Sequence, residues 1–428
     1  MTTEILEALF LLFAFLVVAY LVRHYIFTLT VIRLAERKTS SADGGLCPYE
    51  PTVSILIPAH NEEQVLERTL QRMTELDYPR DKLQIVVIND ASTDRTGEIA
   101  ERFSNVYSHV KVMHRGEHEG GRGKAAALNA AMKLVEKEIV VCFDADYYPQ
   151  SDAVAKLARA FADPRVGAVQ GRVIVLNEPC TVVTRLVALE RIGGYCVDQQ
   201  ARDSLGLIPQ FGGTVGAVRR SLLDSLGGWD ESVLAEDTEL TFRVCLAGYR
   251  VRYDNDAECY EEAVEDWQAY WRQRYRWAKG HMQVAFKHGL KVARSDKLSR
   301  REKVDGLLLL NVYFMPVLVP LSWAIGVALF LSGFSQWFSM VWAVLPICLY
   351  SCVGNFAPFF EVGIGAYLDG RGRASWLMPL LAFTFVYNIL ICTKALIDLA
   401  VGRILGKHKS SWGKTVHSGM VNVRKGQV

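Results

Sequence analysis

Two aspartates separated by one residue, Asp144 and Asp146, directly follow a short apolar segment that ends at Phe143. Two carboxylates at this spacing can offer oxygen atoms to one hard divalent cation, which usually keeps some water and takes its other ligands from a substrate diphosphate. Acidic pairs are also common where a loop begins. The spacing alone therefore leaves two interpretations open, a metal site and an ordinary loop start.

A second acidic pair, Glu236 and Asp237, opens a predicted helix that continues from Thr238 to Leu246. The helix dipole favours acidic side chains in a first turn without any catalytic need. By itself this pair predicts a helix start, and a catalytic role depends on what surrounds it.

Polar residues also gather where two other predicted strands end. His60, Asn61 and Glu62 follow the first predicted strand, and Asp90 follows the second. Ligands of open α/β sheets bind at the carboxyl ends of the strands. We therefore look for the functional site there.

Two glycine-rich segments lie between these polar groups. Gly116 to Gly123 leads to Lys124 and a helix, and its spacing fits neither a P-loop nor a dinucleotide-binding loop. It either approaches a phosphate or only turns the chain. In the second segment, Phe211-Gly212-Gly213-Thr214, the glycines would let the backbone come close to a ligand.

The segment from Trp267 to Phe286 is aromatic, basic and helical in period. Apolar residues recur at three- and four-residue steps, and the basic residues fall mostly between them; the segment includes Gln273, Arg276 and Trp277. One interpretation is a basic amphipathic helix on the inner membrane surface. The other is a helix that joins a catalytic domain to a membrane pore.

Composition limits the class of protein. The chain has 428 residues, is 50% hydrophobic and carries a formal net charge of +2. This length predicts two or more structural units, and the near-balance of charge argues against nucleic acid as the main partner. The nine cysteines include no CxxC pair, which predicts reduced residues and neither a disulfide framework nor a metal cage.

Short strand patterns alternate with helical patterns between residues 50 and 262, which predicts a mostly parallel, doubly wound α/β sheet. The predicted strands are Val53 to Ile57, Leu83 to Ile88, Val110 to Met113, Ile139 to Phe143, Val166 to Val175 and Tyr249 to Tyr253. The predicted helices are Glu62 to Leu76, Asp94 to Phe103, Lys124 to Val135, Cys180 to Asp203 and Arg219 to Leu226. Asp254 to Glu262 is expected to be an acidic connection.

Apolar segments flank this domain on both sides. Residues 1–34 contain one predicted transmembrane helix, Ile5 to Phe27, and residues 301–402 contain three apolar stretches, Val304 to Phe330, Trp337 to Val353 and Ala374 to Val401. Asn355 to Leu368 is expected to be interfacial or re-entrant. The positive-inside rule places the α/β domain and the basic tail, 403–428, in the cytoplasm. Three crossings after the domain would leave the tail outside, so either Asn355 to Leu368 crosses or one apolar stretch does not.

Taken in order, four motifs resemble those of the processive family-2 glycosyltransferases, the cellulose, hyaluronan, chitin and poly-N-acetylglucosamine synthases. They are Asp90, Asp144-x-Asp146, Glu236-Asp237 and Gln273-x-x-Arg276-Trp277. The resemblance runs from about Thr52 to about Phe286. It implies a Rossmann-like GT-A domain, inserted between transmembrane helices, with amphipathic interface helices at 263–300.

The resemblance also implies roles for individual residues. Asp237 would be the general base, with Glu236 beside it, and Asp146, together with Asp144, would hold Mg²⁺ or Mn²⁺. The residues implied to bind the UDP-sugar donor are His60, Asn61, Glu62, Asp90, Lys124, Asp144 and Arg276. Those implied to border the acceptor are Phe211, Gly212, Gly213, Thr214, Gln273 and Trp277.

The basic tail contains one further likeness. Trp412-Gly413-Lys414-Thr415-Val416-His417 is similar to the gating loop of cellulose synthases, in which Trp412 and Thr415 would close over the nucleotide. The segment departs from the usual pattern, because Trp412 stands in place of Phe, Lys414 in place of Val and His417 in place of Lys.

The leading hypothesis is a multi-pass protein of the bacterial inner membrane that polymerises a β-linked glycan from UDP-glucose or UDP-N-acetylglucosamine and moves it across the membrane. Its expected partners are the growing glycan, the bilayer, and accessory export subunits or further copies of the chain. A non-processive enzyme that adds one sugar to a lipid is the alternative. A non-catalytic, nucleotide-binding membrane sensor would lack the general base or the D-x-D pair, and both are present.

Overall fold

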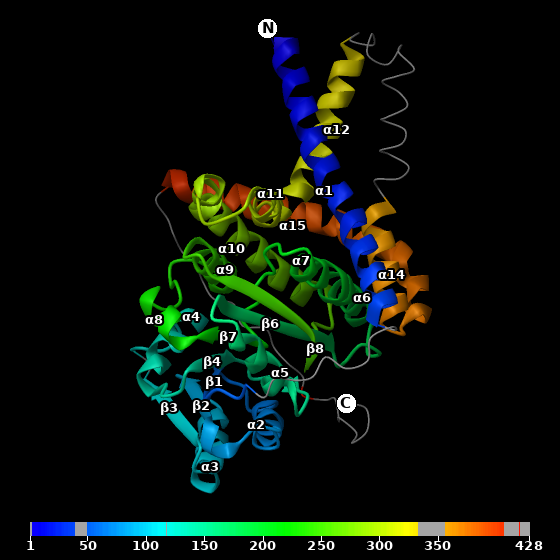
Figure 1. Cartoon of the computed structure of the whole chain (residues 1–428). Coiled ribbons are helices and arrows are strands. Elements are labelled where there is room, and N and C mark those ends of the chain that lie inside the picture. Colours follow the sequence, from blue (N-terminus) through cyan, green and yellow to red (C-terminus); the bar gives the residue numbers. More distant parts are fainter. Residues whose placement is uncertain (1, 39–48, 117, 333–355, 406–418, 420–428) are drawn as a thin grey trace.

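An eight-stranded sheet forms the centre of the α/β body in the computed structural model, which describes residues 2–38, 49–116, 118–332, 356–405 and 419 (Figure 1). The strand order is β3-β2-β1-β4-β7-β6-β8-β5. The strands are β1 (Val53–Ala59), β2 (Leu83–Asp90), β3 (Val110–Arg115), β4 (Ile139–Cys142), β5 (Tyr148–Pro149), β6 (Val166–Val175), β7 (Gly216–Arg219) and β8 (Arg250–Glu261).

The predicted mostly parallel sheet is confirmed. β1 pairs in parallel with both β2 and β4, so that Val53 lies opposite Leu83 on one side and Ile139 on the other. Among the strands of the described residues, only β7 and β5 pair in antiparallel fashion with their neighbours. The parallel pairing brings the carboxyl ends of β1, β2 and β4 to the same edge, as the sequence predicted.

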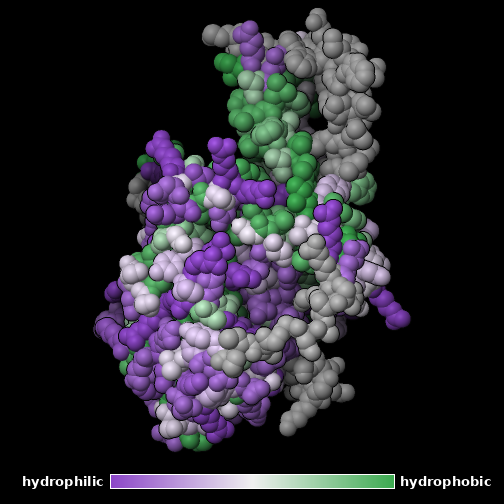
Figure 2. All heavy atoms as spheres, in the orientation of Figure 1, coloured by the Kyte–Doolittle hydropathy of each residue, from purple (hydrophilic) through white to green (hydrophobic). Residues whose placement is uncertain are grey.

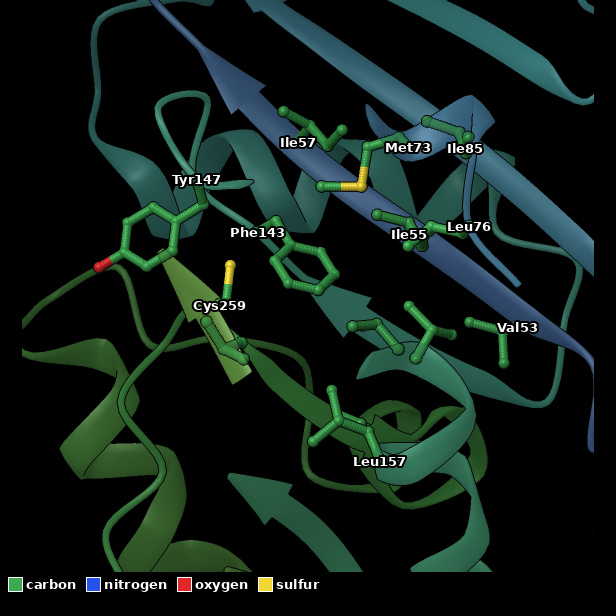
Figure 3. Close-up of a cluster of buried hydrophobic side chains, with 14 of the residues drawn as sticks. Val53, Ile55, Ile57, Met73, Leu76, Ile85, Phe143, Tyr147, Leu157 and Cys259 are labelled. Carbon is green, nitrogen blue, oxygen red and sulfur yellow. The ribbon is translucent and has the colours of Figure 1, made fainter. Parts of the chain in front are cut away.

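Helices cover both faces of this sheet. They are α2 (Leu66–Thr74), α3 (Thr96–Val106), α4 (Lys124–Ala131), α5 (Ala153–Arg159), α6 (Val182–Ile192), α7 (Gln200–Ser204), α8 (Arg220–Ser225), α9 (Glu236–Leu246), α10 (Trp267–Arg294) and α11 (Arg300–Leu310). Figure 3 shows one core layer, in which Ile55 and Ile57 of β1 pack with Met73 of α2 and with Phe143. These side chains are fully buried, and each contributes about 1.5–3 kcal/mol through removal of apolar surface from water.

The prediction for Asp254 to Glu262 is wrong, because most of this acidic segment is strand. β8 pairs in parallel with β6 as far as Val175 opposite Glu261. The acidic residues led to the prediction of a connection. However, Ala257 and Cys259 alternate with them and are fully buried, as in a strand. This extension carries Glu261 and Glu262 to the edge of the sheet where the other polar groups lie.

The predicted helix from Cys180 to Asp203 is interrupted. α6 begins after a capping box of Thr181 with Thr184, and a π-helical segment, Gly193–Gln199, separates it from α7. A side chain at Gly193 would come within 3.0 Å of Val362. The glycine therefore allows the π-helical segment to lie close to α14 (Ala357–Leu368).

The apolar helices differ in how they meet the body. α1 (Thr2–Lys38) and α12 (Met315–Leu331) project from it side by side, with an apolar surface, whereas α15 (Met378–Leu405) lies across the body along α10 (Figures 1 and 2). Among the described residues, three segments are long and apolar enough to cross a membrane: Glu4–Glu36, Val312–Leu331 and Gly372–Leu405.

The expected stretch from Val304 to Phe330 is divided in the structure. α11 ends at Leu310 and packs on the body, and a 3₁₀ turn, Val312–Phe314, leads into α12. α14, in the segment expected to be interfacial or re-entrant, packs through Ala357 on Val17 and Leu21 of α1. The predicted stretch from Trp337 to Val353 lies outside the described residues.

Candidate active site

A cavity of about 450 Å³ opens at the carboxyl ends of the strands. The residues that line it continue to Tyr313, just before α12. Its wall includes Asp90 of β2 and Asp237 of α9, together with Tyr313 from the turn before α12. The strand-end residues and the amino acids next to the apolar helices thus face one space.

Asp90 is fixed at the strand-end side of this cavity. Its side chain accepts a hydrogen bond from Nη1 of Arg115 at 2.5 Å and another from the backbone N–H of Gly121 at 3.2 Å. The backbone carbonyl of Asp90 lies 2.6 Å from Nδ1 of His60. The glycine-rich loop therefore closes onto Asp90, and a side chain at Gly120 would clash with Ala91 at 2.5 Å.

Lys124 connects the D-x-D pair with the second glycine-rich loop. Its Nζ donates to Oδ1 of Asp144 at 2.5 Å and to the carbonyl oxygen of Gly213 at 2.8 Å. Although burial opposes its charge, the carboxylates of Asp144 and Glu236 raise the pKa of Lys124 above its ordinary value. The lysine is therefore held as a cation.

The D-x-D carboxylates fit a cation that relies on its substrate for ligands. Both Asp144 and the buried Asp146 line the cavity. No cluster of three or more His, Cys, Asp or Glu side chains suited to a metal occurs within the described part of the chain. Two carboxylates without a protein cage suit Mg²⁺ or Mn²⁺, which can take further oxygen ligands from water and a diphosphate.

The first turn of α9 supplies two carboxylates with perturbed acidity. Burial, with the neighbouring charge of Asp237, raises the pKa of Glu236 to about 7. Burial also raises the pKa of Asp237, against the hydrogen bond that its Oδ1 accepts from the backbone N–H of Thr238 at 2.6 Å. A carboxylate that is a stronger base than usual, in a cavity, is suited to accept a proton.

Gly213 brings the glycine-rich loop against this base. It has a φ of +72°, and a side chain there would lie 3.0 Å from the Cβ atom of Asp237. Both the backbone conformation and the close approach favour glycine.

α10 contributes Gln273, Arg276 and Trp277 to the cavity wall. The Trp277 ring has two guanidinium groups over it, that of Arg274 at 4.3 Å and that of Arg191 at 5.1 Å from its centroid. Arg191 also makes a two-pronged ion pair with Glu261, at 2.6 and 3.0 Å. Two cation–π contacts hold the indole in place.

Most predicted site residues come together here. Those that line the cavity are His60, Glu62, Asp90, Lys124, Asp144, Asp146, Gly212, Thr214, Glu236, Asp237, Gln273, Arg276 and Trp277. Gly213 does not line the cavity, but it lies against Asp237, which does. Asn61, at a φ of +55°, accepts a hydrogen bond from the backbone N–H of Thr93 at 2.7 Å and is not part of the wall. Phe211 is fully buried and packs beneath Gly216, so it belongs to the core.

Trp412 and Thr415 lie outside the described residues, so their predicted gating role stays a prediction. Gly419 of the same tail is described. Its backbone N–H donates to Oε2 of Glu262 at 3.2 Å, and Glu262 lines the cavity. Gly419 therefore contacts the α/β body beside the cavity.

Several residues of the wall were not predicted. The largest group comprises Arg191, Tyr195, Asp198, Gln199, Arg202, Gln210, His281, Leu309, Val312 and Tyr313, of which the last two lie in the turn before α12. For most of them the sequence signal is a polar or ionisable side chain within a predicted helical segment, whereas Leu309 and Val312 are apolar and Gln210 lies in a loop. A single sequence does not say which of these side chains point to a ligand.

Residues 51–280 match the family described as "Glycosyltransferase like family 2". The chain belongs to this family. The match begins before β1 and ends within α10, so it contains every cavity residue named above except His281, Leu309, Val312 and Tyr313. The family is one of enzymes, and the sensor hypothesis is not supported.

Three curated relatives are informative. "Probable glycosyltransferase YdaM" of Bacillus subtilis is 41% identical over 60% of this chain and 61% of its own length. A beta-monoglucosyldiacylglycerol synthase of Synechocystis is 31% identical over 88% of this chain and 77% of its own length. A poly-beta-1,6-N-acetyl-D-glucosamine synthase of Staphylococcus epidermidis is 29% identical over 58% of both chains.

Among solved structures, the mannosyltransferase PcManGT of Pyrobaculum calidifontis, in complex with GDP-Man and Mn²⁺, is similar. It is 26% identical over 85% of this chain and 99% of its own, with a TM-score of 0.55. The expected GT-A fold with a mostly parallel sheet is confirmed by this similarity and by the family match.

Proposed function

We propose that this chain is a membrane-bound inverting glycosyltransferase that moves one hexose from a UDP-sugar to a hydroxyl group of a membrane lipid. The observation that carries the proposal is one cavity that is lined both by Asp237 and by Val312 and Tyr313 of the turn before α12. A lipid acceptor lies in the plane of the membrane, so its hydroxyl would reach the base from the side of the apolar helices.

The donor would occupy the strand-end side of the cavity. The nucleotide would lie near Asp90 and His60, and its diphosphate near Arg276, whose planar guanidinium suits phosphate oxygens. Asp146 and Asp144 would hold Mg²⁺ or Mn²⁺, which would offset the negative charge of the leaving diphosphate. The similarity to a mannosyltransferase solved with a nucleotide sugar and Mn²⁺ supports this use of a metal.

In the proposed transfer step, Asp237 acts as the general base. Asp237 would accept the proton of the acceptor hydroxyl while its oxygen attacks the anomeric carbon and the bond from that carbon to the diphosphate oxygen breaks. UDP leaves, and the configuration at the anomeric carbon inverts. An α-linked donor thus gives a β-linked product, and Lys124 would hold Asp144 and the Gly213 loop in position during the step.

The share of this chain that each relative matches favours a lipid acceptor over a growing polymer. The match to the glucosyldiacylglycerol synthase of Synechocystis covers 88% of this chain and the matches to two further enzymes of that name cover 62%, whereas the match to the poly-N-acetylglucosamine synthase covers 58%. The longer match extends beyond the α/β body, where the acceptor would enter.

Polymerisation and export of a glycan form the second candidate function. One observation favours it: Gln273, Arg276 and Trp277, the signature of the polymer synthases, all line the cavity. In that case Trp277 would form a platform for the acceptor sugar of the growing chain.

We further propose that the α/β body lies in the cytoplasm with α1 and α12 in the membrane and α15 along its surface. Gly419 contacts Glu262, which supports a tail on the same side as the body. If Trp337 to Val353 crosses as the sequence predicts and α15 stays at the surface, two crossings follow the α/β body, and the tail lies on the same side as the body.

Release of UDP by the detergent-purified chain, with Mg²⁺ or Mn²⁺ and a panel of UDP-sugars, tests the proposal. Products are separated into lipid and polymer fractions. A single-sugar lipid supports the proposed function, and a long glycan supports the second candidate. No release from any UDP-sugar contradicts the donor assignment, and the same assay with GDP-sugars then tests the other donor class.

A further inference from the structure

Two buried side chains line the end of the cavity near α12, and each has a nitrogen atom without a partner among the described residues. Arg202 is 1% exposed and its Nη2 is unpartnered; His281 is 8% exposed and its Nδ1 is unpartnered. A buried polar group left without a hydrogen bond costs about 1–3 kcal/mol. Both residues line the cavity, and the two nitrogen atoms themselves have almost no accessible surface, so a ligand in the cavity supplies the missing bonds when the side chains turn toward it.

Arg202 belongs to a charge-balanced cluster. Its Nε donates to Asp198 at 3.2 Å and its Nη1 donates to Asp305, while Arg23 of α1 lies 3.7 Å from Asp198. Two arginines thus face two aspartates. A phosphate-bearing acceptor would need a surplus of positive charge, which this cluster does not offer.

The other arginines near this end are also paired with carboxylates. Arg191 binds Glu261 and Arg274 binds Glu190. The charges near α12 therefore balance, and they suit an uncharged group that carries hydroxyls.

His281 connects this end with the catalytic base. Its Nε2 lies 3.2 Å from Oγ1 of Thr238, and the backbone N–H of Thr238 donates to Asp237. The imidazole lies 4.7 Å from the ring of Tyr313. Burial lowers the pKa of His281 to about 4, so at neutral pH its uncharged ring offers one nitrogen as donor and one as acceptor.

We propose that Arg202 and His281 form an acceptor subsite that binds the uncharged, hydroxyl-bearing headgroup of a membrane lipid and directs its hydroxyl toward Asp237. The subsite rests on the proposed function, because it specifies which lipids that activity accepts. Diacylglycerol, with one free hydroxyl and no phosphate, represents this class, and phosphatidylglycerol represents hydroxyl-bearing lipids with a negative charge.

The test uses the full chain in phosphatidylcholine vesicles that contain diacylglycerol, phosphatidylglycerol or neither. Labelled sugar in the lipid fraction reports transfer, and UDP release without either acceptor reports donor hydrolysis. His281→Gln keeps a nitrogen near Thr238 but removes Nδ1. Arg202→Lys keeps the positive charge but removes the planar guanidinium group with its several N–H donors.

Both variants should raise the KM for diacylglycerol about tenfold, the effect of about one lost hydrogen bond, while the KM for the donor and donor hydrolysis stay unchanged. His288→Gln and Arg172→Lys are matched controls. His288 is buried on the same helix and bonded to Glu239, and Arg172 is a buried arginine paired with Glu258 and Asp369. Neither control residue lines the cavity, so both should leave the acceptor KM unchanged.

The subsite is overturned if wild-type protein glycosylates lipid but both subsite variants keep its acceptor KM, or if the control variants raise that KM equally. If the wild type prefers phosphatidylglycerol to diacylglycerol, the assignment of an uncharged headgroup is overturned. Failure of the proposed function is a different result, in which the wild type releases UDP but labels no lipid.

Discussion

Lys124 forms an ion pair with Asp144, the first carboxylate of the D-x-D pair, and the same Nζ atom binds the carbonyl oxygen of Gly213. One cation therefore joins the proposed metal site to the loop that lies against Asp237. A metal that uses Asp144 has to share this carboxylate with the lysine.

Lys124→Met should separate metal affinity from turnover. Loss of the positive charge leaves Asp144 fully available, so the Mn²⁺ concentration for half-maximal activity should fall. The Gly213 loop loses its anchor beside the base, so kcat should fall by about tenfold, the cost of about 1.4 kcal/mol in the transition state. Metal titrations of UDP release check both effects. Lys111→Met, which removes an exposed ion pair with Glu136, is the control; a higher Mn²⁺ requirement in Lys124→Met would contradict the shared carboxylate.

Asp237→Asn should abolish transfer and keep donor binding. The amide cannot accept the acceptor proton, while the residues proposed for the nucleotide lie on other elements. We expect kcat to fall by 10²-fold or more, in line with the usual contribution of a general base, and the donor Kd from calorimetry to stay unchanged. Asp224→Asn, at an exposed site on α8, should behave as wild type. Wild-type turnover in Asp237→Asn would remove the general-base assignment.

The raised pKa of Asp237 also predicts how the rate of transfer depends on pH. Burial raises the pKa of Asp237, so its proton is released at a higher pH than from an ordinary aspartate. Transfer needs the deprotonated form, so kcat/KM should decline as the pH falls through this raised value, at a pH above the usual value of about 3.9. Initial rates across a pH series with saturating metal measure this limb. A rate that increases toward acid would mean that the protonated carboxyl is the active form.

The sequence predicted the parallel core and most of the residues that line the cavity. Buried strands such as β1 are continuous apolar runs, and the polar residues at their carboxyl ends follow from chain order and strand direction. The start of β8 was predicted as Tyr249 to Tyr253, but its continuation to Glu261 was missed because the acidic residues there alternate with buried small ones. Phe211 was expected to border the acceptor because of the family resemblance, but its ring fills the space beneath Gly216. The end near α12 depends on contacts between distant segments, such as Arg202 with Asp305, which no local pattern reveals.

Glu236→Gln should stabilise the protein more at high pH than at low pH. Burial raises the pKa of Glu236 from 4.5 to about 7, so between these values the unfolded chain releases a proton that the folded chain keeps. The contribution of this group to stability therefore falls as the pH rises through that window, and it stays unfavourable above pH 7. The melting temperature of Glu236→Gln should exceed that of wild type at pH 8 and match it at pH 4. Glu75→Gln, at an exposed carboxylate, is the control; an equal gain at both pH values would show that charge is not the cause.

Trp277→Ala should impair acceptor handling while some donor hydrolysis remains. The indole lines the cavity with Arg191 and Arg274 over its ring, so its removal takes away an apolar wall and leaves both guanidinium groups without their aromatic contact. The two arginines keep their ion pairs with Glu261 and Glu190, so the fold should persist. We expect the acceptor KM to rise and the ratio of donor hydrolysis to transfer to increase, as measured by UDP release against labelled product. Trp271→Ala removes a tryptophan of the same helix that packs on Tyr387 outside the cavity. An equal change in both variants would assign the effect to the packing of α10 and not to the acceptor.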